Sequence, residues 1–363
     1  MGKRVKEILK GAGDRLTIEQ GAALLGVSGS EVWEVTKLAD EERYLKVGEK
    51  ITFVKNRNIN ITNICINSCG FCGYSRKKKS PDAYYLSEEE FSAKVRDAVA
   101  HDVTEICSVS GLHPDFSLDS YTHIYRLIHR IAPKLHIHAS NPMEVAYASR
   151  QSGCETTEVL KEFKKAGLGS LCGTAAEILD DKVRGIICPD KIKTDEWARI
   201  IREAHALGIK STATIMYGHV ENDLDRMHHL ALIRDIQEET RGFTEFVPLS
   251  FIHPESPLYK SGKARAGATG REDILMYAVS RLFLDNIPNL QASWVKLGVK
   301  MSSLALMAGA NDIGGTMYEE RISKSAGAQS TDYLDPKEMK RVANDCGRPL
   351  LQRTTLYELI RPV

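Results

Sequence analysis

The sequence is poor in several features that would point to specialised classes of protein. It has eight cysteines among 363 residues, too few for a scaffold held together by disulfides. Lysine and arginine number 49 and aspartate and glutamate 48, so the net charge of +1 excludes a globally basic nucleic-acid binder. No apolar run approaches the ~18 residues of a membrane span. We therefore expect a globular protein with neither a nucleic-acid nor a membrane partner.

The beginning of the chain also lacks targeting signals. Residues 1–10 are charged and do not contain the apolar segment of a signal peptide. Lys6 breaks the pattern required for N-terminal myristoylation. The expected compartment is the cytoplasm, where clustered cysteines more often bind metal or do chemistry than form disulfides.

Hydrophobic patterning predicts an α/β protein in which short strands alternate with longer amphipathic helices. This alternation pairs strands in parallel, and eight candidate strands predict a TIM-type (β/α)8 barrel. An open doubly wound sheet is the alternative, although no G-x-G-x-x-G follows the first strand. The candidate strands are residues 52–62, 104–109, 135–139, 169–171, 211–216, 245–251, 290–295 and 308–313.

We expect the chain to divide into three parts. Residues 1–50 read as a helical extension, in which Thr17 and Gln20 have the spacing of a capping box. Residues 51–330 form the predicted barrel, and residues 331–363 a helical tail packed on it.

Cys65, Cys69 and Cys72 form a cluster with the spacing C-x3-C-x2-C directly after the first predicted strand. Soft thiolates select zinc, copper(I) or iron–sulfur clusters. Structural zinc normally has four protein ligands, and the nearest other cysteine, Cys107, lies 35 residues away within a predicted strand. Three ligands predict a metal centre with one open position. A zinc site with a distant fourth ligand and three metal-free core cysteines are the alternatives.

The cysteine loop resembles the signature of the radical S-adenosylmethionine (SAM) family, in which an aromatic residue, here Phe71, precedes the last cysteine. The resemblance implies a radical SAM (β/α) barrel with a [4Fe–4S] cluster on the three cysteines. The remaining iron would bind the amino and carboxylate groups of SAM. Reduction by a donor of the flavodoxin or ferredoxin type would then yield a 5′-deoxyadenosyl radical that abstracts hydrogen.

Further segments between about residues 50 and 330 resemble the deazaflavin and menaquinone biosynthesis subgroup of that family. Residues 173–179, 187–191 and 242–249 look most like its tyrosine-dependent aryl transferases. That resemblance implies coupling of the hydroxybenzyl part of L-tyrosine to 5-amino-6-(D-ribitylamino)uracil for coenzyme F-420, and a ring-closing radical SAM subunit as a candidate partner. An aminofutalosine synthase of menaquinone biosynthesis and a metal-binding module without turnover are the alternatives.

Residues at the carboxyl ends of barrel strands face the active site, so the loops there supply the candidate cofactor contacts. The resemblance implies that the backbone of Ser110 and Gly111 receives the SAM amino group. Glu177 could bind ribose hydroxyls or an ammonium, and Arg184 on the same helical face a carboxylate, with a surface ion pair as the alternative. The candidate cofactor contacts are Phe71, Tyr74, Ser110, Gly111, Ser140, Glu177, Arg184 and Met216.

Two histidines are candidate catalytic residues because imidazole titrates near neutral pH. His113 lies in the loop after the second predicted strand, and His138 shares one face of the third with His136. Solvated or core histidines are the alternative interpretation. Candidate substrate contacts at other strand ends are Asn141, Tyr217, Phe251, His253, Ser293, Asn311, Asp312 and Gly314.

Overall fold

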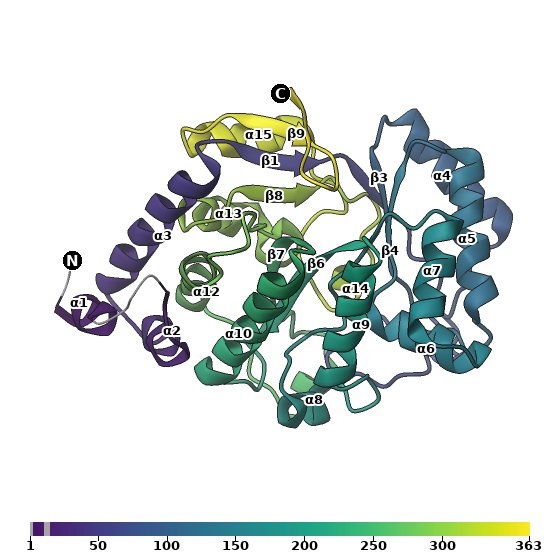
Figure 1. Ribbon diagram of the computed structural model, residues 1–363, viewed down its shortest axis with the longest axis horizontal. Helices are drawn as coiled ribbons and strands as arrows, with labels where there is room; N and C mark the ends of the chain where they lie inside the picture. Colours follow the sequence, from purple (N-terminus) through teal and green to yellow (C-terminus); the bar gives the residue numbers. More distant parts are fainter. Residues whose placement is uncertain (1–2, 11–14) are drawn as a thin grey trace.

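The computed structural model describes residues 3–10 and 15–363, which form a curved, mostly parallel sheet surrounded by helices (Figure 1). Six strands lie side by side in chain order, and every neighbouring pair is parallel. They are β2 (Asn56–Asn58), β3 (Glu105–Ser108), β4 (His136–Ala139), β5 (Ser170–Leu171), β6 (Lys210–Tyr217) and β7 (Phe243–Ser250).

A second sheet of four strands completes the barrel. In the order of the sheet these are β10 (Leu359–Pro362), β9 (Leu350–Arg353), β1 (Ile51–Val54) and β8 (Asp312–Gly315). Only Lys55 separates β1 from β2, so one bent strand belongs to both sheets. On the other side, single parallel bridges from Leu290 to Phe246 and from Gln291 to Asp312 connect β7 with β8. These links join the sheets into a TIM-type barrel and confirm the predicted fold class.

Two expectations about the barrel were wrong. The predicted strand at 290–295 provides only those two bridges, because the chain turns into helix α13 (Trp294–Met307) before a strand can extend. The C-terminal tail is not purely helical, since β9 pairs in parallel with β1 and β10 pairs antiparallel with β9. Four-residue strands leave too short a hydrophobic pattern to be recognised.

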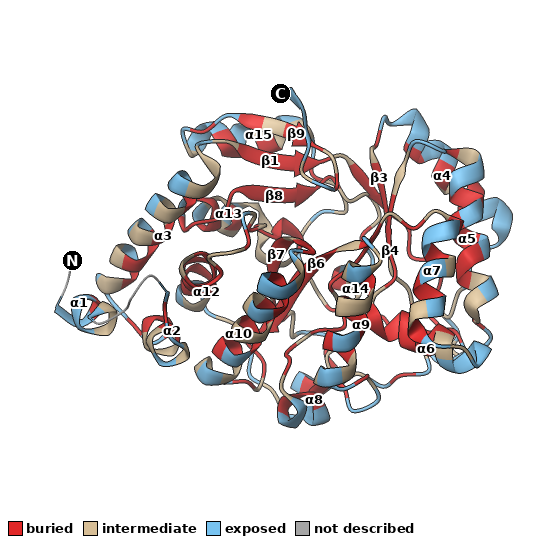
Figure 2. Ribbon diagram, in the orientation of Figure 1, coloured by how far each residue is buried: buried red, intermediate tan, exposed pale blue. Residues whose placement is uncertain are grey.

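Helices cover the outside of the barrel and bury one face each (Figure 2). In α5, for example, Tyr121, Tyr125 and Ile128 are buried against the body of the protein. The longer barrel helices besides α13 are α4 (Glu88–Ala100), α5 (Leu118–Ile131), α6 (Pro142–Ser152), α7 (Thr156–Ala166), α9 (Thr194–Ala206), α10 (Asp223–Thr240) and α12 (Gly270–Phe283). The shorter ones are α8 (Asp181–Ile187), α11 (Pro257–Lys260) and α14 (Ile322–Ser325).

The two ends of the chain add helices on neighbouring sides of the barrel (Figure 1). The N-terminal ones are α1 (Lys3–Leu9), α2 (Ile18–Leu25) and α3 (Glu31–Val47), of which α2 contacts α10 and α3 contacts α12. Helix α15 (Pro336–Asp345) packs against α13 and β9. The capping box is confirmed: Gln20 N donates to Thr17 Oγ1 at 3.2 Å and Thr17 N to Gln20 Oε1 at 3.0 Å. The predicted boundaries at residues 50 and 330 stay predictions.

None of the helices in the described part of the chain is long and apolar enough to cross a membrane.

Candidate active site

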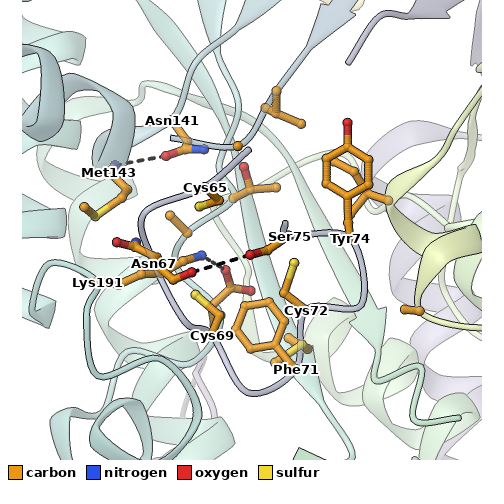
Figure 3. Close-up of a pocket in the computed structure, with 18 of the residues that line it drawn as sticks. Cys65, Asn67, Cys69, Phe71, Cys72, Tyr74, Ser75, Asn141, Met143 and Lys191 are labelled. Atoms are coloured by element: carbon orange, nitrogen blue, oxygen red, sulfur yellow. Dashed lines mark hydrogen bonds and ion pairs between the residues drawn. The ribbon is translucent and has the colours of Figure 1, made fainter. Parts of the chain in front are cut away.

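The three clustered cysteines lie on the loop that follows β2 and line one pocket, here called the cysteine pocket (Figure 3). The loop is tied to the body by backbone hydrogen bonds, from Gly70 N to Ile187 O at 2.8 Å and from Ile66 N to Leu112 O at 3.0 Å. A Cβ on Gly111 would lie only 2.3 Å from the carbonyl oxygen of Ile64, so the loop approaches this closely because position 111 has no side chain.

The donor set of the cysteine pocket suits an iron–sulfur cluster. Figure 3 shows the thiols of Cys65, Cys69 and Cys72 around a common space. In residues 3–10 and 15–363, no three histidine, cysteine or acidic side chains gather closely enough to hold a single ion. A cubane cluster instead distributes its cysteines over different irons, so it needs thiols around a space rather than at one point. Burial raises the pKa of Cys65 and raises that of Cys69 to about 12, so metal loading must displace these protons.

Lys191 and Glu177 form a buried ion pair on the wall of the cysteine pocket. The Lys191 Nζ lies 2.5 Å from Glu177 Oε1 and 5.2 Å from the centre of the Phe71 ring. Burial opposes ionisation of Glu177, but the adjacent lysine charge holds the pKa of this carboxyl below its ordinary value. Glu177 also adopts a left-handed backbone conformation with φ 48°, which is uncommon for residues other than glycine. Sequence reasoning missed Lys191, although it ends one of the segments that carry the family resemblance.

Glu144 is a second carboxylate in the cysteine pocket that sequence reasoning missed. Its side chain is buried, and its Oε2 atom has no hydrogen-bond partner within the described chain. Burial raises its pKa to about 8. The residue lies in the first turn of α6, where acidic side chains are common for local reasons, so its position alone did not single it out.

Most of the predicted cofactor contacts line this pocket. They are Phe71, Tyr74, Ser110, Gly111, Glu177 and Met216, joined by two residues predicted to contact substrate, Asn141 and Phe251. Asn141 is partly engaged elsewhere, because its Oδ1 caps α6 by accepting from Met143 N at 3.0 Å. Ser140 lies outside the pocket, and its hydroxyl is hydrogen-bonded to that of Tyr125 at 2.6 Å.

Arg184 has a different position from the one predicted. It is 3 % exposed, so it is neither half of a surface ion pair nor a lining residue of the pocket. Its guanidinium donates to the carbonyl oxygens of Ala175, Ala176, Ile178 and Ile192. Because three of these carbonyls, those of residues 175, 176 and 178, flank Glu177, Arg184 shapes the loop that presents that carboxylate.

A second cavity lies inside the barrel and is here called the barrel cavity. It is lined by residues of β1 to β4 and β6 to β9 and of the segments beside them, among them three of the predicted site residues, His138, Ser293 and Gly314. Val109, Thr174, Leu249, Lys296 and Ile322 line both the barrel cavity and the cysteine pocket. The two spaces therefore adjoin, and a group bound in one can reach a group bound in the other.

Buried charges form what is here called the floor of the barrel cavity, with Glu105 at the start of β3, Glu245 near the start of β7 and Arg353 at the end of β9. Glu245 Oε2 accepts from Gln291 Nε2 at 3.0 Å, from Arg353 at 3.3 Å and from the Tyr357 hydroxyl. Burial raises the pKa of Glu245 to about 7, although Arg353 opposes this shift. Arg353 also donates to Asp312 at 2.5 and 3.0 Å, so its guanidinium is already engaged by two carboxylates.

Glu105 adds another carboxylate to that floor. Its oxygens accept from Asn56 Nδ2 at 3.0 Å and from Thr355 Oγ1 at 2.7 Å. The floor thus carries more carboxylates than guanidinium groups, and it favours ligands rich in hydrogen-bond donors. Sequence reasoning missed Glu105, Glu245 and Arg353, because nothing local shows that β9 brings its arginine under the barrel.

His138 is the one predicted catalytic histidine that faces a cavity. Its Nδ1 is hydrogen-bonded to Ser170 Oγ at 2.7 Å, and the same hydroxyl bonds His136 Nε2 at 2.8 Å. Burial lowers the pKa of His138 to about 4, so the ring is neutral at physiological pH. His113 lines neither cavity; it is buried and stacks on Tyr85 with ring centres 5.3 Å apart.

Four predicted substrate contacts also lie outside both cavities. The Tyr217 hydroxyl donates to Asp273 Oδ1 at 2.6 Å, because alternation along β6 turns this side chain away from Met216. His253 packs against a neighbouring tyrosine ring. Asn311 and Asp312 accept hydrogen bonds from buried arginines and hold the base of β8.

Comparisons with known proteins agree with this arrangement. The family model described as the radical SAM superfamily matches residues 59–233, and the one described as the CofH/MqnC C-terminal region matches residues 240–362. The structure is similar to that of HydG, a maturase of the [FeFe]-hydrogenase, with a TM-score of 0.74 and 18% identity over 97% of this chain and 76% of that one. It is also similar to methylornithine synthase, with a TM-score of 0.68 and 16% identity over 95% of this chain and 96% of that one. These solved structures support the fold alone.

The fold and the three-cysteine pocket define a radical SAM protein, and the chain belongs to that superfamily. A relative from Methanoculleus marisnigri is 60% identical over 96% of this chain and 95% of its own. Another from Methanothermobacter thermautotrophicus is 46% identical over 99% of each chain. Both are named 5-amino-6-(D-ribitylamino)uracil–L-tyrosine 4-hydroxyphenyl transferase, and within the superfamily the chain belongs to this family rather than to the menaquinone enzymes.

Proposed function

We propose that this protein transfers the 4-hydroxybenzyl group of L-tyrosine to 5-amino-6-(D-ribitylamino)uracil. The observation that carries the proposal is the pair of adjoining spaces: a pocket with three cysteine thiols, open to a barrel cavity with a carboxylate-rich floor. The names of relatives that match nearly the whole chain support it. A hydrogen-abstracting group generated in one space can act on a substrate held in the other.

The cysteine pocket would hold the cofactors. Cys65, Cys69 and Cys72 would bind a [4Fe–4S] cluster, which together with SAM supplies the one-electron chemistry that removes hydrogen from tyrosine. Glu177 would accept hydrogen bonds from the ammonium and hydroxyl groups of such a ligand, and the Glu144 carboxyl would be a further polar contact. Lys191 and the carbonyl ring around Arg184 keep Glu177 ionised and in place.

The barrel cavity would hold the substrates. Glu105 and Glu245 would accept hydrogen bonds from ring N–H groups and ribityl hydroxyls, since both side chains line this cavity. The neutral His138 offers its Nε2 atom as a further polar contact. Apolar walls such as Val247 and Leu249 exclude water, which protects reactive intermediates from side reactions.

The proposal includes two partners beyond the substrates, and a compartment. A one-electron donor of the flavodoxin or ferredoxin type is needed because the cluster must be reduced. The cytoplasm is the proposed compartment, as expected for such donors. A ring-closing radical SAM enzyme is the proposed partner, since it would consume the coupled uracil.

An anaerobic assay tests the function directly. Reconstituted, reduced protein is incubated with SAM, L-tyrosine and 5-amino-6-(D-ribitylamino)uracil, and products are identified by mass spectrometry. We expect the coupled uracil together with methionine and 5′-deoxyadenosine. Release of 5′-deoxyadenosine without any coupled uracil would contradict the substrate assignment. Colourless protein with stoichiometric zinc would contradict the cofactor assignment.

A further inference from the structure

Lys296 occupies the boundary between the two cavities. Five residues line both spaces, and Lys296 is the one among them with a charged side chain. It lies in the first turn of α13, where its backbone N–H donates to Ser293 O at 3.0 Å. After one turn the helix is interrupted at Gly298, whose φ of 71° is not helical. The position therefore presents a cation where the cofactor and substrate spaces meet.

The Lys296 ammonium differs from the other cations of the site because it has no ion-pair partner among the described residues. Lys191 is paired with Glu177 at 2.5 Å, and Arg353 is engaged by Glu245 and Asp312. The acidic neighbour of Lys296, Glu320, already accepts backbone hydrogen bonds from the first turn of α14. A cation that lines a cavity without an ion-pair partner attracts an anion, and the chain does not provide one here.

The chemistry of the proposed substrates identifies that anion. The ribityl uracil has no carboxylate, whereas L-tyrosine has an α-carboxylate. The floor of the barrel cavity repels such a group, since the Glu105 carboxylate lines it and Arg353 is already engaged by two acidic side chains. With its carboxylate at Lys296, tyrosine would place the Cα–Cβ bond at the boundary and direct the aryl group into the barrel.

We propose that the Lys296 ammonium binds the α-carboxylate of the amino-acid substrate. This inference rests on the proposed function and adds to it the residue that selects and orients tyrosine. Cleavage of the Cα–Cβ bond would leave the two-carbon fragment at the boundary and release the aryl fragment on the side of the barrel cavity.

The test is equilibrium binding to reconstituted holoenzyme with SAM but without reductant, so that no turnover occurs. Two ligands are compared: L-tyrosine and L-tyrosinamide, in which a neutral amide replaces the carboxylate. We expect the wild type to bind tyrosine more tightly than the amide. Lys296→Met should weaken tyrosine binding about 10- to 100-fold, the range of a charge-assisted contact, and leave amide binding within about 3-fold.

Two further variants make the comparison specific. Lys296→Arg retains the charge and should recover most of the tyrosine affinity. Lys300→Met removes an exposed lysine from the same helix and should change neither affinity. Iron content and melting temperature establish that each variant is folded and loaded. The comparison of tyrosine with tyrosinamide in the wild type does not depend on any variant. Equal affinities of the wild type for the two ligands would overturn the inference.

SAM also has a carboxylate, so SAM binding is measured in parallel. Weaker SAM binding by Lys296→Met with unchanged tyrosine binding would assign the lysine to the cofactor and overturn the inference. Unchanged tyrosine binding by a folded Lys296→Met protein, in a wild type that forms the coupled uracil, overturns the inference and leaves the proposed function intact. A wild type that neither binds tyrosine nor forms that product overturns both.

Discussion

The cysteine pocket and the barrel cavity share five lining residues but are built in different ways. The cysteine pocket depends on one loop, with its three thiols inside eight consecutive positions, and its carboxylate Glu177 is balanced by Lys191. The barrel cavity is assembled from strands at opposite ends of the chain, and carboxylates outnumber cations on its floor. The first is suited to hold a metal cluster and a zwitterionic ligand, the second a neutral ligand rich in hydrogen-bond donors.

The largest effect is expected at the cluster. Cys69→Ala removes one of three ligands, and because a cubane cluster needs all of them, iron binding and formation of the coupled uracil should both be lost. Iron content, visible absorbance and electron paramagnetic resonance check the first, and mass spectrometry the second. Cys346→Ala is the matched control, since that thiol lies at the end of α15 beside Ser303, and it should retain cluster and product. Turnover by Cys69→Ala would refute the ligand assignment.

A stability measurement distinguishes the buried carboxyl of the cysteine pocket from ordinary acids. The pKa of Glu144 is raised from 4.5 to about 8, so between these pH values the folded protein binds a proton that the unfolded chain releases. The contribution of Glu144 to the free energy of unfolding of the apoprotein should therefore fall by about 3–5 kcal/mol as pH rises through this window.

Glu144→Gln should remove that pH dependence, because an amide does not titrate. The exposed Glu158→Gln, on the next helix, should retain it. Chemical denaturation at a series of pH values measures both slopes. Equal pH dependence of stability in the wild type and in Glu144→Gln would show that the pKa of Glu144 is not raised in the folded protein.

The cysteine pocket and the barrel cavity also show why one cavity could be predicted from the sequence and the other could not. The cysteine loop is a local pattern, and its ligands and its place after a strand can be recognised without knowing the fold. The capping box that begins α2 is local too, and it is present. Arg353 reaches Glu245 and Asp312 only because β9 pairs with β1, a contact between opposite ends of the chain.

The errors among the predicted site residues have related causes. Tyr217 was chosen as a strand-end residue, but a shift of one position along a strand turns the side chain to the other face. Arg184 has the right spacing to face Glu177, but backbone carbonyls compete for its guanidinium. Burial and hydrogen-bond competition depend on tertiary packing, which a residue pattern does not contain.

The acidic floor of the barrel cavity should affect the reaction of the uracil and not the binding of SAM. Glu245→Gln replaces one acceptor oxygen of the carboxyl by an amide N–H donor, and formation of the coupled uracil should fall about 10- to 100-fold. SAM binding should be unchanged, because Glu245 lines only the barrel cavity. Single-turnover product formation and SAM affinity are measured side by side, with the exposed Glu358→Gln as the control. An equal loss of SAM affinity would show that the two spaces do not act separately.

The smallest effect is expected where the C-terminal segment meets the floor. Thr355→Val keeps the shape of the side chain but removes the hydroxyl that donates to Glu105 at 2.7 Å. Glu105 keeps its hydrogen bond from Asn56, so the cost should be about 1 kcal/mol, seen as a roughly 5-fold higher KM for the uracil. Thr354→Val, one residue earlier and outside the cavity lining, should leave that KM unchanged. If both variants raise the KM equally, the C-terminal segment acts on the barrel as a whole, and Glu105 has no individual role in holding the substrate.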